Sequence, residues 1–341
     1  MKKLFSTGLV VVISLLMLVI YTSDASSPGK KYTTDSTETA DPLLTWNEGQ
    51  AKSSIISYVE SISDPKNKNF IEPEDRIATF DNDGTLWSEK PFYFQLYFTL
   101  YTLDTLVKEK PELLKDELIK AAVDRDFKTL AKHGEHGLVK LALITHGNST
   151  DEEFAEGVKR WLSETEHPTK NRKYNELIFQ PMLELMDYLR NNDFKVFIVS
   201  GGGRDFMREF ACETYGVPQY MTIGSSIKVK YNEETKKIQR LPEMEFIDDK
   251  AGKPAGIYKY IGKKPVFVAG NSDGDLQMMQ YAQTNEKGYF NLLIHHTDSI
   301  REWAYDKESH VGKLDKALIE AGKNNWTVVD MEKDWKTVFP E

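Results

Sequence analysis

The sequence is poor in cysteine and has fewer basic than acidic residues. It has one cysteine, Cys212, in 341 residues, which excludes an internal disulfide and a zinc site built from cysteines. Its 44 Lys and Arg residues are outnumbered by 53 Asp and Glu residues, so the formal charge is −9 at pH 7. Nucleic acids are bound by clustered Lys and Arg, so this balance argues against nucleic acid as a partner. A small phosphorylated ligand stays compatible with it, because local amides, a lysine and a metal ion can override the global charge.

A hydrophobic run lies near the N-terminus. Two lysines precede the run Leu9–Tyr21, and small residues follow it as far as Ala25. This pattern predicts a signal peptide over residues 1–25, cleaved after Ala25. The alternative is an uncleaved anchor, because the apolar stretch approaches the ~18 residues that span a membrane. In both cases we expect an exported protein, periplasmic or extracellular, and it meets the membrane only through this segment if the segment stays uncleaved.

Short apolar runs that end at polar turns recur along the chain. Runs of this kind, separated by stretches with helical spacing, indicate parallel strands with helices on both faces of the sheet. The pattern predicts an α/β fold, a Rossmann-like doubly wound parallel sheet, whose ligand lies beyond the carboxyl ends of the strands. The expected strands are 76–80, 195–199, 265–269 and 289–294.

The expected domain organisation follows from the segments between these strands. Residues 26–44 are polar and aperiodic, which predicts a flexible linker. More than a hundred residues separate the first two strands, far more than one crossover helix needs. We therefore expect an α/β core over 45–90 and 178–341, interrupted by a helical cap over 91–177. Alternating residues around Asn232-Glu233-Glu234-Thr235 predict a small β-hairpin within 225–247.

Two carboxylates follow the first expected strand. Asp81 and Asp83 stand at positions i and i+2, so they should share one face of a cleft at the strand end. Like charges so close need a cation or a proton between them. One could then attack an electrophile while the other moves protons. Gly84 allows a tight turn, and Thr85 could cap a helix or donate to a phosphate oxygen. Taken alone, the segment is also compatible with an ordinary solvated turn.

The other strand ends carry complementary groups. A hydroxyl followed by glycines, Ser200-Gly201-Gly202-Gly203, suits the binding of phosphate by backbone amides, with Arg204 next on the expected helix. Pro254 suits a first helical position, which would aim Lys253 at the strand ends. The turn Gly270-Asn271-Ser272-Asp273-Gly274-Asp275 offers oxygen ligands that Mg²⁺ prefers.

Taken in this order, the four elements resemble the motifs of the haloacid dehalogenase superfamily. Asp81-Asn82-Asp83-Gly84-Thr85-Leu86 fits its DxDGT signature, and Val199-Ser200-Gly201-Gly202 is similar to the phosphoserine-phosphatase-like branch. Lys253 matches the third motif best, with Lys250 as the alternative. The Gly270–Asp275 turn matches the fourth motif, with Asn271 where the family usually has a metal-binding aspartate.

The resemblance implies a role for each matched residue. Asp81 would be the nucleophile and Asp83 the acid and base, while Ser200 and Lys253 would hold the phosphoryl group. The implied Mg²⁺ ligands are Asp81, Asp83 through its carbonyl, Asn271 and Asp275. Because an amide brings one negative charge fewer than a carboxylate, we expect weaker Mg²⁺ binding or a compensating role for Asp273. The implied substrate-binding residues are Thr85, Glu89, Gly201, Gly202 and Arg204.

The resulting hypothesis is a Mg²⁺-dependent phosphomonoester hydrolase (EC 3.1.3.-) that acts on a small phosphorylated substrate through an aspartyl-phosphate. One alternative is another phosphoryl-transfer enzyme of the same superfamily. A second is a non-catalytic phosphate-binding module with a weakened metal site, which Asn271 alone favours. The histidines beside glycines and the pair His295-His296 lack the spacing of a zinc site, so loop or packing roles are expected for them.

Overall fold

A parallel sheet forms the centre of the protein, in a computed structural model that describes residues 41–341. The sheet has seven strands in the order β4-β3-β2-β1-β5-β6-β7, and every pair is parallel except β3 with β4. The predicted α/β class with a mostly parallel sheet is confirmed. The strands are β1 (Ile77–Phe80), β2 (Lys195–Gly203), β3 (Thr222–Asn232), β4 (Lys237–Phe246), β5 (Phe267–Gly270), β6 (Phe290–His295) and β7 (Thr327–Asp330).

Strand β1 lies between β2 and β5. All four of its residues are buried, as expected for an apolar strand covered on both faces. Phe80 is in register with Ile198 of β2 and with Ala269 of β5. The carboxyl ends of these three strands therefore meet at one edge of the sheet, which places the polar turns that follow them side by side.

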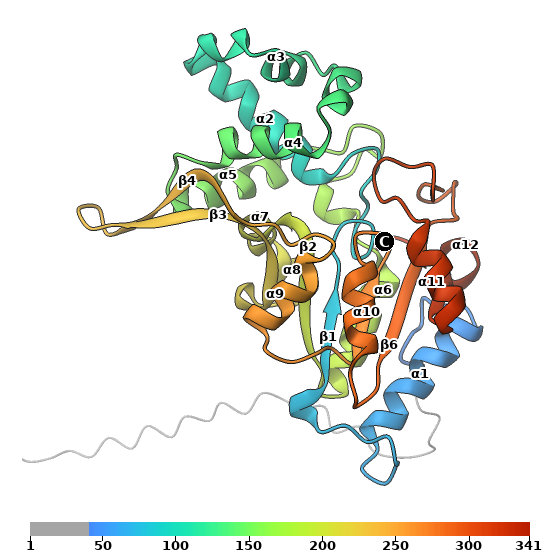
Figure 1. Cartoon of the computed structure of the whole chain (residues 1–341). Coiled ribbons are helices and arrows are strands. Elements are labelled where there is room, and N and C mark those ends of the chain that lie inside the picture. Colours follow the sequence, from blue (N-terminus) through green and yellow to red (C-terminus); the bar gives the residue numbers. More distant parts are fainter. Residues whose placement is uncertain (1–40) are drawn as a thin grey trace, which may run out of the picture. The chain divides into compact units, whose positions relative to one another are not determined.

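Helices flank the sheet and fill the long segment between β1 and β2. Figure 1 shows α2 to α5 grouped beyond the end at which β1 finishes. A capping box opens α5, with Thr150 and Glu153 exchanging both hydrogen bonds. The helices are α1 (Gln50–Ser63), α2 (Phe94–Glu109), α3 (Glu117–Val123), α4 (Phe127–His146), α5 (Asp151–Glu164), α6 (Gln180–Asn191), α7 (Arg204–Arg208), α8 (Ala211–Tyr215), α9 (Gly252–Tyr260), α10 (Leu276–Gln283), α11 (Lys316–Asn324) and α12 (Met331–Asp334).

The predicted hairpin is present as β3 and β4, joined by a turn over residues 233–236. It extends away from the sheet on the side of α5 (Figure 1). Arg240 of β4 connects it to the helical segment, since its backbone N–H donates to the Ser149 carbonyl and its guanidinium to the His146 carbonyl. The division of the chain into a core and a cap at 91–177 stays a prediction, because residues 41–341 form one compact unit.

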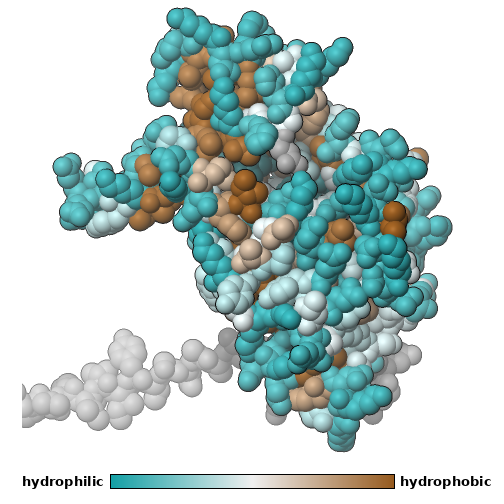
Figure 2. Space-filling view, in the orientation of Figure 1, coloured by the Kyte–Doolittle hydropathy of each residue, from teal (hydrophilic) through white to brown (hydrophobic). Residues whose placement is uncertain are grey.

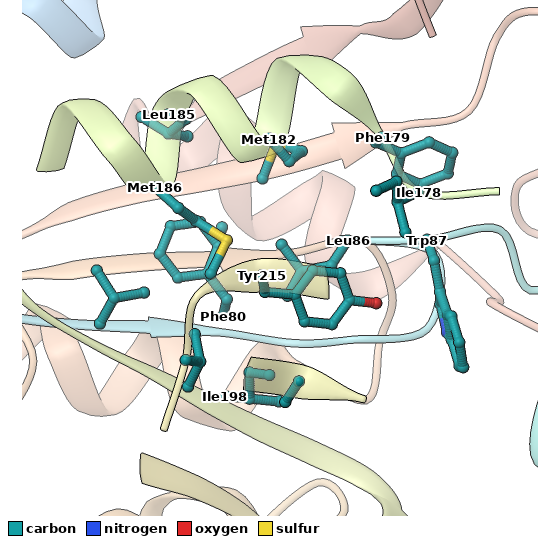
Figure 3. Close-up of a cluster of buried hydrophobic side chains, with 14 of the residues drawn as sticks. Phe80, Leu86, Trp87, Ile178, Phe179, Met182, Leu185, Met186, Ile198 and Tyr215 are labelled. Carbon is teal, nitrogen blue, oxygen red and sulfur yellow. The ribbon is translucent and has the colours of Figure 1, made fainter. Parts of the chain in front are cut away.

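A hydrophobic cluster lies directly beneath the first polar turn. Phe80, Leu86 and Trp87 are fully buried and pack near Met182 and Met186 of α6 (Figure 3). The Trp87 ring stacks on Phe210, with ring centroids 4.5 Å apart. The turn after β1 is thus anchored at Phe80 before it and at Leu86 and Trp87 after it, which holds the intervening residues in place.

Figure 2 shows a mostly hydrophilic face with hydrophobic surface on the hairpin and over the helices between β1 and β2. Within residues 41–341, no helix is long and apolar enough to cross a membrane. The predicted signal peptide and most of the predicted linker lie outside the described residues. Leu43, at the end of that linker, is fully buried.

Candidate active site

Asp81 is the first residue after β1. Its backbone N–H donates to the Ala269 carbonyl of β5 over 3.0 Å, which continues the ladder by one bond. The chain then turns, because the Asn82 carbonyl accepts from the N–H groups of Thr85 and Leu86. Asp81 is 7% exposed, so its carboxylate is held at the sheet edge with limited access to water.

Lys253 contacts this carboxylate from the first turn of α9. Its Nζ donates to Asp81 Oδ1 over 2.6 Å, to Asp275 Oδ1 over 2.7 Å and to the Val199 carbonyl over 2.8 Å. Burial alone would lower the pKa of Lys253, but the Asp275 and Asp81 carboxylates raise it above its ordinary value. The helix begins at Gly252, two residues before the expected Pro254. The alternative Lys250 is more than half exposed and pairs with Asp249.

Asp81 and Asp83 have raised pKa values for the same primary reason. Burial and the nearby Asp275 carboxylate raise the pKa of Asp81, and Lys253 opposes them. Burial raises the pKa of Asp83 to about 6, against a hydrogen bond that Trp87 Nε1 donates to Asp83 Oδ1 over 2.8 Å. Asp83 is therefore suited to exchange a proton near neutral pH, whereas Asp81 is paired with a fixed cation.

The turn after β5 is organised by Asp275. Its Oδ2 accepts from the N–H groups of Asn271 (3.0 Å) and Ser272 (3.1 Å), while its Oδ1 accepts from Lys253. Asp275 thus joins the turn to the lysine and is itself fully buried. Asp273 lies apart from this arrangement, because its Oδ1 accepts from the N–H groups of Asp315 and Ala317. The compensating role considered for Asp273 therefore does not fit its contacts.

Ser200 and its glycines extend β2. The sequence predicted a strand that ends at Val199, but β2 runs to Gly203, with an irregular register against β3 between Ser200 and Gly203. Ser200 is 1% exposed, and its Oγ accepts from the Gly202 N–H over 3.1 Å. A Cβ at Gly202 would lie 3.4 Å from Asp83 Oδ2, which places this backbone against the acid.

Three residues predicted to bind substrate have other partners. Thr85 is fully buried, and its hydroxyl donates to Asn271 Oδ1 over 3.3 Å. Glu89 is 1% exposed and accepts from Asn271 Nδ2 over 2.8 Å. Arg204 pairs with Asp205 over 3.0 Å. The first two are hydrogen-bonded to Asn271 in the turn after β5, and Arg204 belongs to an ion-pair cluster on α7.

Two residues at the start of the helical segment face the site and were not predicted. Gln95 Oε1 accepts from the Gly203 N–H over 2.7 Å and lies 3.5 Å from where a Gly202 Cβ would be. Burial and the charges of Glu89 and Asp83 raise the pKa of Tyr93, which places its hydroxyl near these carboxylates. Their position directly before and within the first turn of α2 is a signal that could have identified them.

The segment after β6 supplies further contacts that the sequence did not indicate. His296 is 2% exposed, and its Nε2 donates to the Gly84 carbonyl over 2.7 Å. Its Nδ1 lies 3.2 Å from Glu302 Oε2, and Ser88 donates to Glu302 Oε1 over 2.8 Å. This histidine therefore packs against the turn that carries Asp83, and its place at a strand end was the available signal.

The donor set of the site fits a hard cation. Lys253 is in contact with the carboxyl groups of Asp81 and Asp275, and Asp83 lies on the same turn as Asp81, so the site holds three carboxyl groups and one ammonium. Every donor available is oxygen, as Mg²⁺ prefers. Within residues 41–341, no three His, Cys, Asp or Glu side chains are grouped closely enough to hold a metal ion. Binding would therefore draw on Asp81, the Asp83 carbonyl and the Asn271 amide oxygen.

Comparisons with known proteins agree with this geometry. The family model described as haloacid dehalogenase-like hydrolase matches residues 78–280. No curated protein matches the sequence. A conserved, functionally unknown protein from Anaerococcus prevotii DSM 20548 is 16% identical, with 87% of this chain and 97% of that chain covered and a TM-score of 0.56, which shows a shared fold.

Two further solved structures have lower TM-scores. A phosphoserine phosphohydrolase-like protein from Francisella tularensis subsp. tularensis SCHU S4 is 15% identical, with 74% of this chain and 94% of that chain covered and a TM-score of 0.40. A probable phosphoserine phosphatase from Vibrio cholerae is 12% identical, with coverages of 81% and 76% and a TM-score of 0.39.

Proposed function

Since the chain belongs to the haloacid dehalogenase-like hydrolases, we propose that it is a Mg²⁺-dependent phosphatase that hydrolyses a small phosphomonoester with Asp81 as nucleophile. The observation that carries this proposal is the contact of Lys253 with both Asp81 and Asp275. This lysine holds the attacking carboxylate in place and offers positive charge where the phosphoryl oxygens would gather.

In the first step, Asp81 attacks phosphorus, and the bond from phosphorus to the leaving oxygen breaks as the bond to the Asp81 carboxylate forms. Asp83 gives its proton to the leaving alkoxide. Its pKa of about 6 leaves a useful protonated fraction near neutral pH. Trp87 fixes the orientation of Asp83 by its hydrogen bond, so the proton is delivered from one side of the turn.

In the second step, Asp83 takes a proton from water, and the resulting hydroxide attacks phosphorus of the aspartyl-phosphate. Inorganic phosphate leaves and the Asp81 carboxylate is regenerated. Lys253 stays hydrogen-bonded at the nucleophile throughout, and the Ser200–Gly202 backbone lies against Asp83 where the phosphoryl group would sit. Mg²⁺, held by Asp81, the Asp83 carbonyl and Asn271, would neutralise charge on the phosphoryl oxygens.

Tyr93 and Gln95 are proposed to contact the leaving group, because they enter the site from the segment between β1 and β2. We also propose that the enzyme acts outside the cytoplasm, on the strength of the lysines and hydrophobic run that precede Ala25.

The test is phosphate release from a panel of phosphomonoesters, measured with Mg²⁺ and with a chelator. We expect Mg²⁺-dependent release that Asp81→Asn abolishes, with the folded state of the variant checked by circular dichroism. Full activity of the Asp81→Asn variant would contradict the assignment of the nucleophile. Tight Mg²⁺-dependent phosphate binding without turnover on any ester would contradict the proposed activity.

A further inference from the structure

A buried glutamate stands behind the metal-binding turn. Glu89 is 1% exposed, and its Oε1 accepts two hydrogen bonds, one from Asn271 Nδ2 (2.8 Å) and one from the Tyr305 hydroxyl (2.7 Å). Burying a carboxylate is unfavourable because it loses its contacts with water, so the groups that hydrogen-bond to it in the folded protein point to its role. One of these partners is the residue that replaces a carboxylate at the metal-binding position.

The contact decides which way the Asn271 amide is turned. Asn271 Nδ2 donates to Glu89 Oε1 over 2.8 Å, so the NH₂ group of Asn271 faces Glu89. The amide oxygen then faces the opposite way, where the Thr85 hydroxyl donates to it over 3.3 Å. A hydrogen bond from the NH₂ group to a carboxylate also increases the negative charge on the amide oxygen. Asn271 is thereby both oriented and made a stronger oxygen ligand.

Glycines from two distant segments make room for this pair. A Cβ at Gly84 would lie 2.0 Å from Asn271 Nδ2 and 2.5 Å from Glu89 Oε1. A Cβ at Gly312 would lie 1.8 Å from the same Glu89 oxygen. Both glycines have positive φ angles, 74° and 65°, which other residues rarely adopt. The backbone of the nucleophile turn and that of the segment after β6 are therefore both fitted around the Glu89 carboxylate.

The segment after β6 closes the carboxylate from the other side. Lys90 contacts the Ser309 hydroxyl, and its Nζ donates to the Val311 carbonyl over 2.8 Å and lies 3.9 Å from the centroid of the Tyr305 ring. Residues 305–312 lie beyond the region 78–280 that the family model matches. The Glu89 environment is thus built partly by a portion of this chain outside the matched hydrolase region.

We propose that Glu89 is a metal-positioning residue. Glu89 does not touch the cation itself. Through its hydrogen bond with Asn271, it supplies the negative charge that Asn271 lacks and holds the Asn271 amide oxygen toward the cation. The inference rests on the proposed Mg²⁺-dependent function. Both hydrogen bonds to Glu89 Oε1 come from within the protein, from Asn271 and Tyr305.

The proposal is tested by moving the carboxylate from position 89 to position 271. The proteins compared are wild type, Glu89→Gln, Asn271→Asp and the double variant, with Mg²⁺ binding measured by isothermal titration calorimetry without substrate. Loss of an outer contact that orients a metal ligand weakens affinity by about 10- to 100-fold, which we expect for Glu89→Gln. Asn271→Asp alone should not tighten binding, because it places two carboxylates in contact. The double variant should recover the wild-type affinity to within about threefold.

Tyr305→Phe is the matched control, because it removes the other hydrogen bond to Glu89 and leaves its charge in place. We expect its Mg²⁺ affinity to stay within about threefold of wild type. If Glu89→Gln does not fold, the double variant should still bind Mg²⁺ about tenfold more tightly than Asn271→Asp. The increase in melting temperature caused by Mg²⁺ gives a second readout in each protein.

Three results would overturn the inference. If Glu89→Gln bound Mg²⁺ as tightly as wild type, the Glu89 charge would not contribute to Mg²⁺ binding. If the double variant bound Mg²⁺ no more tightly than the weaker of the two single variants, a carboxylate at position 271 would not replace that of Glu89. Either result would leave the proposed phosphatase function intact. A wild-type protein that does not bind Mg²⁺ would overturn both the inference and the proposed metal dependence.

Discussion

Removal of the Lys253 ammonium should destabilise the protein in a pH-dependent way. Lys253 is 2% exposed and is hydrogen-bonded to the Asp81 and Asp275 carboxylates. Removing one partner of a buried ion pair costs about 3–5 kcal/mol, because a buried charge is left uncompensated. We therefore expect Lys253→Met to lower the free energy of unfolding by about that amount near pH 9.

The sign of the pH dependence follows from the carboxylates. Burial already raises the pKa of Asp81, and loss of the lysine removes a contact that lowers it. A carboxyl group whose pKa is raised by folding destabilises the protein as the pH rises through the interval between its unfolded and folded pKa values. The deficit of Lys253→Met relative to wild type grows as the pH rises from the folded pKa of Asp81 in wild type, about 8, towards its higher value in the variant, so it should be larger near pH 9 than near pH 6.

Urea unfolding followed by tryptophan fluorescence at several pH values measures this deficit. The matched control is Lys250→Met, which removes an exposed lysine from the same segment and should change stability by less than about 0.5 kcal/mol. The activity of Lys253→Met should also fall by about 100- to 1,000-fold. A Lys253→Met protein as stable as wild type near pH 9 would refute the idea that Lys253 neutralises two buried carboxylates.

Two further predictions concern single carboxyl groups. Trp87→Phe removes the hydrogen bond that lowers the pKa of Asp83, so the alkaline limb of the profile of kcat/KM against pH should move up by about one pH unit. An alkaline limb at the same pH as in wild type would contradict the role of Asp83 as proton donor. Asp248 is fully buried, and among the described residues its carboxylate oxygens have no hydrogen-bond partner; burial raises its pKa to about 7. Its ionisation should therefore lower the free energy of unfolding of the wild-type protein as the pH rises from about 4 to about 7. Over that range the stability of Asp248→Asn, measured by urea unfolding, should increase relative to wild type by up to about 4 kcal/mol. Parallel stability curves of the two proteins against pH would contradict this.

Local sequence patterns were sufficient to locate the four central strands of the sheet. The apolar runs that became β1, β2, β5 and β6 could be found because each is continuous and ends at a polar turn. The short strand β7 (Thr327–Asp330) was not predicted, and it pairs with β6. The end of β2 was misplaced because glycines usually mark a turn, whereas here they continue the strand beside β3.

The site was predictable where it depends on neighbours in sequence and unpredictable where it depends on distant contacts. Asp81 and Asp83 share one turn, and Lys253 lies at a helix start, so their meeting could be inferred from the order of the elements. The partners of Glu89 could not, because Tyr305 follows it by 216 residues and Asn271 by 182. No periodicity or spacing in a single sequence reports a contact over such a distance.

The nucleophile itself can be observed directly. Wild-type protein is mixed with Mg²⁺ and a hydrolysed phosphomonoester, quenched in acid during turnover, digested and mapped by mass spectrometry. We expect one phosphoryl group on Asp81, greater accumulation in Asp83→Asn because the second step lacks its base, and none in Asp81→Asn. Phosphate release without a phosphorylated Asp81 in either the wild-type protein or Asp83→Asn would contradict the central claim.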